Sequence, residues 1–248
     1  DWALSLARTG LTFSCLWCDL FFDTIANNLR KGEDIEVIHR QCLRIDLFKH
    51  FRWKEPGHKD IDIKINQKID GLAFRGRRAK EAIRNLTKRM EEKGVEITNN
   101  NKGLQNWLKE AEIILKNDSD AKNEFESDLN KDEGSGNDRI TTSNIKEFYD
   151  YSLKCRSKIG DHADLYYVAL SSGNNWTYID PSPEWLVVIS QLSKQKVEHT
   201  LRLKDVMQSI RLLGIDASNS AVSRKLEQIG LCNLKEDADE GLEVYNGF

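Results

Sequence analysis

Apolar residues recur at helical spacing through the first half of the chain. The stretches 1–30 and 34–51 each show this spacing, and so do a stretch that ends at Gly94 and a stretch over 102–116. A period near 3.6 residues is typical of amphipathic helices, and a glycine after the last periodic position favours a helix end. We therefore expect residues 1–116 to form a helical domain.

The middle of the chain changes in composition. Residues 117–138 are rich in Asn, Asp, Glu, Ser and Gly, which predicts an acidic flexible linker. Residues 139–181 are predicted to be a connector made of one helix and a β-hairpin. The hairpin is expected because the aromatic and β-branched runs 165–170 and 176–179 flank a Ser-Ser-Gly-Asn-Asn turn. The expected fold class is thus mainly α with a small β-hairpin.

The stretch 182–248 carries three further helix signals and then alternation. Ser182 is placed to cap a first helix, whose first position is a proline. A second helix ends at Gly214, and a third, capped by Ser218 or Asn219, ends at Gly230. The stretches 231–235 and 242–245 then alternate around an acidic turn and predict a second hairpin.

This order of a helix, a short extended piece, two helices and a hairpin resembles winged-helix domains of the helix-turn-helix type. In that family the third helix enters the major groove near its N-terminus, which implies DNA contacts here from Asn219, Ser220, Ser223 and Arg224. The resemblance implies phosphate contacts from Lys204, Arg211 and Lys225. We therefore expect a DNA-binding protein, or the DNA-binding part of a larger complex with other protein subunits.

The predicted wing departs from a DNA-binding pattern. Lys235 is its one basic residue, and five carboxylates surround it: Glu236, Asp237, Asp239, Glu240 and Glu243. Carboxylates beside a phosphate backbone are repelled by it. A protein-docking scaffold that uses this acidic wing is therefore an alternative function.

Charge is unevenly distributed, although the formal net charge is only −3. Residues 71–93 hold eight basic and three acidic side chains, whereas 117–138 hold eight acidic and two basic ones. The two segments are expected to attract each other, and the basic one to be a solvated helix face. The alternative is a phosphate-binding surface made by Arg75, Arg77, Arg78, Arg84 and Lys88.

Gly76-Arg77-Arg78, taken as the opening of a helix, and the helix after Gly94 give residues 71–116 a second resemblance, to the lid of AAA+ ATPases of the initiator type. It implies that Arg78 senses nucleotide and that the chain is the lid and winged-helix part of such an ATPase. The chain has no Gly-x-x-x-x-Gly-Lys-Ser/Thr phosphate loop. This reading is a further alternative to plain DNA binding.

Other chemical motifs are sparse. Cys15, Cys18, His39 and Cys42 have a spacing that zinc could use, but core residues surround the first pair, so we expect no metal or other cofactor. Asp62-x-Lys64 resembles part of a nuclease strand but has no second carboxylate nearby. A loop at 161–164 holds a histidine with no partner. The sequence favours binding over catalysis.

The five cysteines are an odd number in a long chain, which favours a reducing compartment. The apolar run near residue 20 is interrupted by Asp19 and Asp23 before it is long enough to span a bilayer. We therefore expect an intracellular protein, in the cytoplasm or nucleus, with no membrane partner.

Overall fold

The computed structural model describes most of the chain and divides it into two compact units. It describes residues 2–45, 51–53, 65–95, 103–131, 144, 147–154, 165–172, 176–194, 200–233 and 241–245. The first unit comprises Asp1–Ser14, Asp46–Ile69 and Glu147–Phe248, and the second comprises Cys15–Ile45 and Asp70–Lys146. These units do not follow the predicted boundaries at 116, 138 and 181, since each is assembled from separated pieces of chain.

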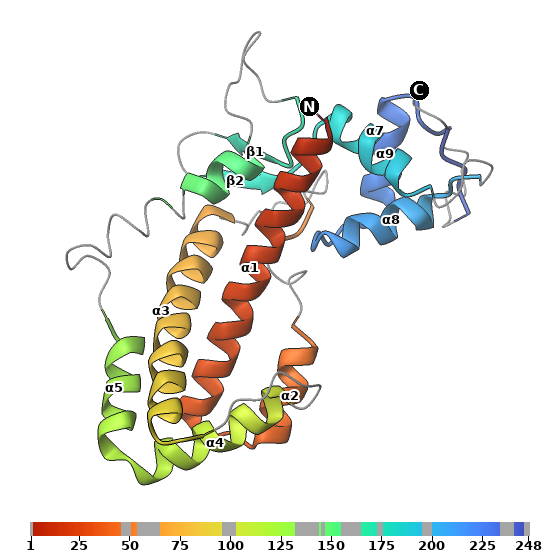
Figure 1. Cartoon of the computed structure of the whole chain (residues 1–248). Helices are drawn as coiled ribbons and strands as arrows, with labels where there is room; N and C mark the ends of the chain where they lie inside the picture. Colours follow the sequence, from red (N-terminus) through yellow and green to blue (C-terminus); the bar gives the residue numbers. More distant parts are fainter. Residues whose placement is uncertain are drawn as a thin grey trace. The chain divides into compact units, whose positions relative to one another are not determined.

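The described part of the chain is mainly helical, as predicted (Figure 1). The elements are α1 (Trp2–Lys31), α2 (Ile35–Leu43), α3 (Ile65–Glu92), α4 (Gly103–Asn117), α5 (Ser119–Leu129), β1 (Ala169–Ser172), β2 (Trp176–Ile179), α7 (Pro183–Leu192), α8 (Leu203–Leu212) and α9 (Asn219–Gln228). Residues 147–153 are also helical. None of the described helices is long and apolar enough to cross a membrane.

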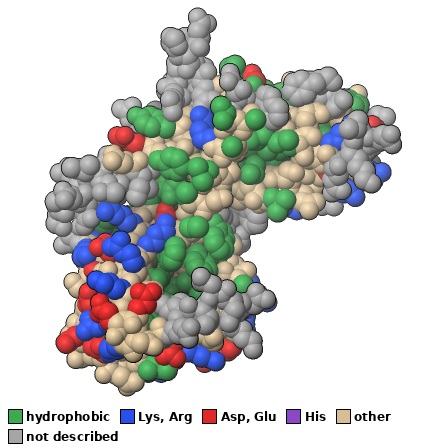
Figure 2. Space-filling model, viewed as in Figure 1, with side chains coloured by type: hydrophobic (Ala, Val, Ile, Leu, Met, Phe, Trp, Pro, Cys, Tyr) green, Lys and Arg blue, Asp and Glu red, His purple; other side chains and the backbone are tan. Residues whose placement is uncertain are grey.

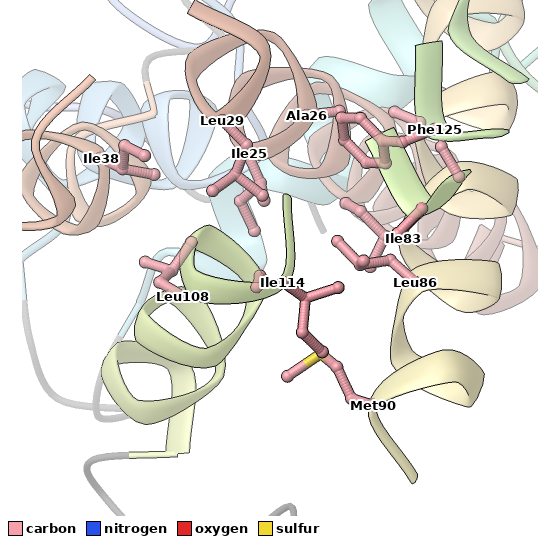
Figure 3. Packing of buried hydrophobic residues seen from close by; sticks show 14 of the residues in the cluster. Ile25, Ala26, Leu29, Ile38, Ile83, Leu86, Met90, Leu108, Ile114 and Phe125 are labelled. Atoms are coloured by element: carbon pink, nitrogen blue, oxygen red, sulfur yellow. The ribbon is translucent and has the colours of Figure 1, made fainter. Parts of the chain in front are cut away.

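The second unit is built around a core to which all five of its helices contribute. Ile25, Ala26 and Leu29 of α1 meet Ile83 and other side chains in Figure 3. The labelled partners come from α2 (Ile38), α3 (Leu86, Met90), α4 (Leu108, Ile114) and α5 (Phe125). Each is at most 9% exposed. Burial of this apolar surface is what holds the helices together, because isolated helices of these lengths are marginal in water.

Helix α3 is longer than predicted, and Gly76 lies well inside it. The expectation that Gly76-Arg77-Arg78 opens a helix is therefore wrong, since the helix begins at Ile65. A Cβ atom at Gly76 would lie 2.4 Å from the Cβ and 2.6 Å from the Cα of Asp19 in α1. The two helix backbones can approach this closely because glycine has no side chain.

Residues 119–129, predicted to be part of a flexible linker, form helix α5. Asp118 caps the helix by accepting a hydrogen bond from the backbone N–H of Ala121 at 2.9 Å. Ala121 and Phe125 are buried in the core of the second unit. The prediction of a linker is wrong here because those apolar side chains and the cap stabilise the helix despite its acidic composition. Residues 132–138 lie outside the described part of the chain.

In the first unit, β1 and β2 form the predicted antiparallel hairpin, with Ala169 opposite Ile179 and Ser172 opposite Trp176. The hairpin is continuous with α7, because the Ser182 N–H donates to the carbonyl oxygen of Tyr167 at 3.0 Å. This bond explains why no domain boundary lies at residue 181.

Helices α7, α8 and α9 all pack against one another in this unit. Ser182 accepts from the Trp185 N–H at 3.1 Å and caps α7, with Pro183 at its start, as predicted. The helix ends predicted at Gly214 and Gly230 are confirmed, and both glycines have positive φ values of 88° and 77°. The shared core is made by Trp185, Leu186 and Ile189 of α7, Val206, Met207 and Ile210 of α8, and Val222 and Leu226 of α9.

Candidate functional site

The turn between α8 and α9 sets which side chains of α9 face outward. Ser218 accepts a hydrogen bond from the Ala221 N–H at 3.2 Å and fixes the start of the helix. Ala221, Val222 and Leu226 are buried. The exposed stripe then falls at positions i, i+4, i+7 and i+8, namely Ser220, Arg224, Glu227 and Gln228.

Among the predicted DNA-contacting residues of α9, Ser220 and Arg224 are exposed and Asn219 is half-buried. Ser223 is only 2% exposed, so the prediction that it faces outward is wrong. Its hydroxyl donates to the carbonyl oxygen of Ser220 at 3.3 Å, and its own carbonyl oxygen accepts from the Cys232 thiol at 3.4 Å. Ser223 therefore holds the helix to the chain that follows it.

Lys225, a predicted phosphate contact, has a partner inside the first unit. Its Nζ lies 2.6 Å from Oδ1 of Asp180, and the two side chains are 23% and 24% exposed. A charge-assisted hydrogen bond this short and partly buried is among the stronger polar contacts in proteins. Lys225 anchors α9 to the residue after β2.

The two predicted phosphate contacts on α8 lie on its exposed stripe. Lys204 and Arg211 are exposed, together with Gln208 and Leu212, again at positions i, i+4, i+7 and i+8. Within the part of the chain that the structure describes, Lys204, Arg211 and Arg224 form no ion pair with a carboxylate. These three cations are therefore available to an anionic ligand.

The extended pieces that flank the helices pair through their backbones. The Leu203 N–H donates to Leu242 O and the Val244 N–H donates to Leu201 O, both at 2.8 Å. The Tyr245 N–H donates to Leu231 O at 2.6 Å, as expected for the predicted hairpin. Of its acidic residues, Glu243 is exposed and opposite Arg202, whereas Lys235, Glu236, Asp237, Asp239 and Glu240 lie outside the described residues.

The basic side chains of α3, the second predicted phosphate surface, lie among acidic ones, as the mixed blue and red atoms over α3 and α5 in Figure 2 show. Arg75 pairs with Asp23 at 3.3 Å and Lys88 with Glu92 at 3.9 Å. Arg78 lies 3.8 Å above the ring centre of Phe74. Of the other two candidates, Arg77 is half-buried and Arg84 is exposed.

The predicted attraction between the basic and acidic segments is confirmed where α3 ends. Asp118 Oδ2 lies 2.6 Å from Lys93 Nζ and 3.3 Å from Arg89 Nε, and Arg89 also contacts Glu124 at 2.7 Å. The hydrogen bond from Lys93 is the main reason why the pKa of Asp118 is lowered below its ordinary value. The N–H of Ala121 and the charge of Arg89 add to it.

The cysteines and His39 of the candidate zinc set do not gather into one site. Cys42 is buried in the core of the second unit, and burial raises the pKa of its thiol to about 11. Cys15 and Cys18 are half-buried on α1, and His39 Nδ1 lies 3.4 Å from Gln105 Nε2. Within the described ranges, no three His, Cys, Asp or Glu side chains are grouped as a metal site requires.

The remaining sequence motifs cannot be placed, because Asp62, Lys64 and residues 161–164 lie outside the described residues. Comparison with protein-family profiles, with curated proteins and with solved structures finds no match to this chain. The outward faces of α8 and α9 therefore remain the candidate site, on the basis of their own geometry and charge.

Sequence reasoning missed two residues beside this site. Arg52 Nε lies 3.4 Å from Oδ2 of Asp216, in the turn before α9. No local pattern around residue 52 indicates this neighbour, since the contact joins segments far apart in the chain. Alternation of the apolar Phe51 and Trp53 about a basic residue was the one signal for an extended segment there.

Proposed function

We propose that α7, α8 and α9, with the extended pieces around them, form a winged-helix module that binds duplex DNA through the exposed face of α9. Three observations support the fold: the three helices pack on one another, a tight turn separates α8 from α9, and residues 201–203 pair with 242–244. In helix-turn-helix proteins the helix after the turn lies in the major groove. That helix here is α9.

The observation that carries the proposal is the presence of three outward cations without carboxylate partners among the described residues. Lys204, Arg211 and Arg224 lie on exposed helix stripes and have no such partner there. On α3, by contrast, Arg75, Lys80, Arg89 and Lys93 each pair with a carboxylate. Unpaired cations on one face bind phosphate with little loss of existing contacts, because only counterions have to leave.

Roles for the individual residues follow from their positions. Arg224, in the centre of the α9 stripe, is assigned to a base edge, where an arginine fits the two acceptors of guanine. Lys204 and Arg211 are assigned to phosphates, together with Ser220. Ser223 and Lys225 take no part, because the first is buried and the second is held by Asp180.

The test is the fluorescence anisotropy of a labelled mixed-sequence duplex titrated with the full chain over about 50 to 200 mM salt. Arg224→Ala is expected to weaken binding, and the triple variant with Lys204→Ala, Arg211→Ala and Arg224→Ala is expected to lower the log–log salt slope by about 2 to 3. Arg40→Ala is the matched control, because Arg40 is an exposed arginine of α2 in the other unit.

All of these substitutions are at exposed positions, so far-UV circular dichroism is expected to be unchanged. If the wild-type chain does not bind the duplex at the lowest salt, or if the triple variant binds with the affinity and slope of Arg40→Ala, the proposed function is wrong.

A further inference from the structure

The turn that precedes α9 is held by a short segment from a distant part of the chain. The Trp53 N–H donates to the carbonyl oxygen of Asp216 at 2.8 Å, and the Asp216 N–H donates to the carbonyl oxygen of Phe51 at 2.9 Å. The two residues that flank Arg52 therefore both bond to Asp216. Trp53 also pairs with Ile179 at the end of β2, so the segment links the hairpin to the turn.

Arg52 points away from the core because its neighbours point into it. Phe51 is fully buried and Trp53 is 5% exposed, and the Phe51 ring meets Phe13 edge to face at 5.3 Å between centroids. Side chains alternate between the two sides of an extended segment. The Arg52 side chain is accordingly 75% exposed. Two buried aromatic anchors thus fix the backbone of an exposed arginine, which lowers the entropy lost when that arginine binds a ligand.

The position of Arg52 makes it part of the α9 face. Asp216, whose carboxylate lies 3.4 Å from the arginine, is two residues before Ser218, the cap of α9. The Asp216 side chain is 42% exposed, and an uncompensated carboxylate there would repel a phosphate that approaches Ser220. Charges within about 8 to 10 Å act on each other at physiological salt, so Arg52 changes the potential at the start of α9.

We propose that Arg52 is a phosphate-binding residue of the α9 site, contributed by the Phe51–Trp53 segment, and that it exchanges its ion pair with Asp216 for a phosphate of the duplex. This proposal rests on the proposed function. An exposed ion pair is weak, so a phosphate can replace the carboxylate at little loss. Arginine suits the exchange, since its fork of N–H donors matches a phosphate as well as a carboxylate.

The experiment compares three variants of the full chain in the same anisotropy assay. Arg52→Ala is expected to weaken duplex binding and to lower the salt slope by about 1, as for loss of one phosphate contact. Asp216→Asn is expected to tighten binding, because it removes a competing negative charge. The double variant is expected to keep the lowered slope, because removal of Asp216 does not replace the phosphate contact.

The double variant separates a phosphate contact from simple neutralisation. If Arg52 only cancels the charge of Asp216, the double variant returns to the wild-type slope, and the proposal is overturned. It is overturned too if Arg52→Ala has the slope of Arg40→Ala while Arg224→Ala weakens binding. If Arg224→Ala and the triple variant also have no effect, the proposed function itself has failed. Thermal melting of Arg52→Ala is expected to stay near that of the wild type, since the lost ion pair is exposed.

Discussion

Gly76 is the position where the packing of α1 against α3 can be tested with one methyl group. In Gly76→Ala the new Cβ would lie 2.4 Å from the Cβ, 2.6 Å from the Cα and 2.8 Å from the Cγ of Asp19. Ordinary contacts between carbon atoms are about 3.5 to 4.0 Å. The Cα is backbone, and Asp19 is held by Lys80 of α3 at 2.8 Å with only 3% of the residue exposed. The helices must therefore separate by about 1 Å.

Two opposing effects determine the magnitude. Alanine in place of glycine within a helix stabilises it by about 0.5 to 1 kcal/mol. Overpacking of an interface typically destabilises by about 1 to 3 kcal/mol, and the upper part of this range applies because a backbone atom obstructs the methyl group. The expected net destabilisation is about 1 to 2 kcal/mol. For a chain of this size that corresponds to a fall in Tm of roughly 2 to 8 °C.

Gly71→Ala is the matched control on the same helix. Its Cβ would meet only the Arg75 side chain, with Nη1 at 3.1 Å, and that flexible end can move away. The helix-propensity gain is then unopposed, so Gly71→Ala is expected to raise Tm by about 1 to 4 °C. Both variants are compared with wild type by thermal and urea unfolding. If Gly76→Ala is as stable as Gly71→Ala, the close approach of α1 to Gly76 is wrong.

Three further predictions concern other features of the fold. Phe125→Ala is expected to destabilise by about 3 to 5 kcal/mol in urea unfolding, and the exposed Lys122→Ala on the same helix by little, because only Phe125 is in the core; equal effects would contradict the packing of α5. Because the pKa of Asp118 is lowered in the folded chain, its ionised form stabilises the fold above the ordinary value of 3.8 and loses this effect as pH falls toward the folded-state pKa. Asp118→Asn keeps a capping side chain, and its stability is expected to fall less steeply than that of wild type below about pH 4; parallel curves would refute this. The pKa values of Cys42 and Cys232 are both raised to about 11 by burial, so iodoacetamide at pH 8 is expected to modify them only after unfolding, as mass spectrometry of peptides would report.

Local signals in the sequence were sufficient for much of the helical architecture. Ser182 and Pro183 start α7, and Gly214 and Gly230 stop α8 and α9, because capping and positive φ depend on a few adjacent residues. The hairpin of β1 and β2 was predicted for the same reason. Each of these features can be recognised without knowing what packs on it.

Features that depend on distant partners were missed. Helix α5 has the composition of a linker, and it folds because Phe125 enters a core made by four other helices. Gly76 looked like a helix start, but its role is to let Asp19 of another helix approach. Both were missed because they are properties of packing, which composition and spacing do not encode.

The candidate site was predicted in part. The outward positions of Arg224, Lys204 and Arg211 followed from helical periodicity. Ser223 and Lys225 were misjudged, since the pattern could not reveal the chain around Cys232 or the ion pair with Asp180. Arg52 was not foreseen, because an extended segment does not indicate which turn it joins.

The hydrogen bonds between the Phe51–Trp53 segment and Asp216 also have a consequence for the timing of synthesis. The two partners are about 160 residues apart, so at ~5 to 20 residues per second the first waits roughly 10 to 30 s for the second to be made. During that interval two aromatic side chains destined for the interior have no final partner in the turn. The ribosome-bound chain is thus expected to expose a sticky segment early, and to depend on chaperones until α8 and α9 have emerged.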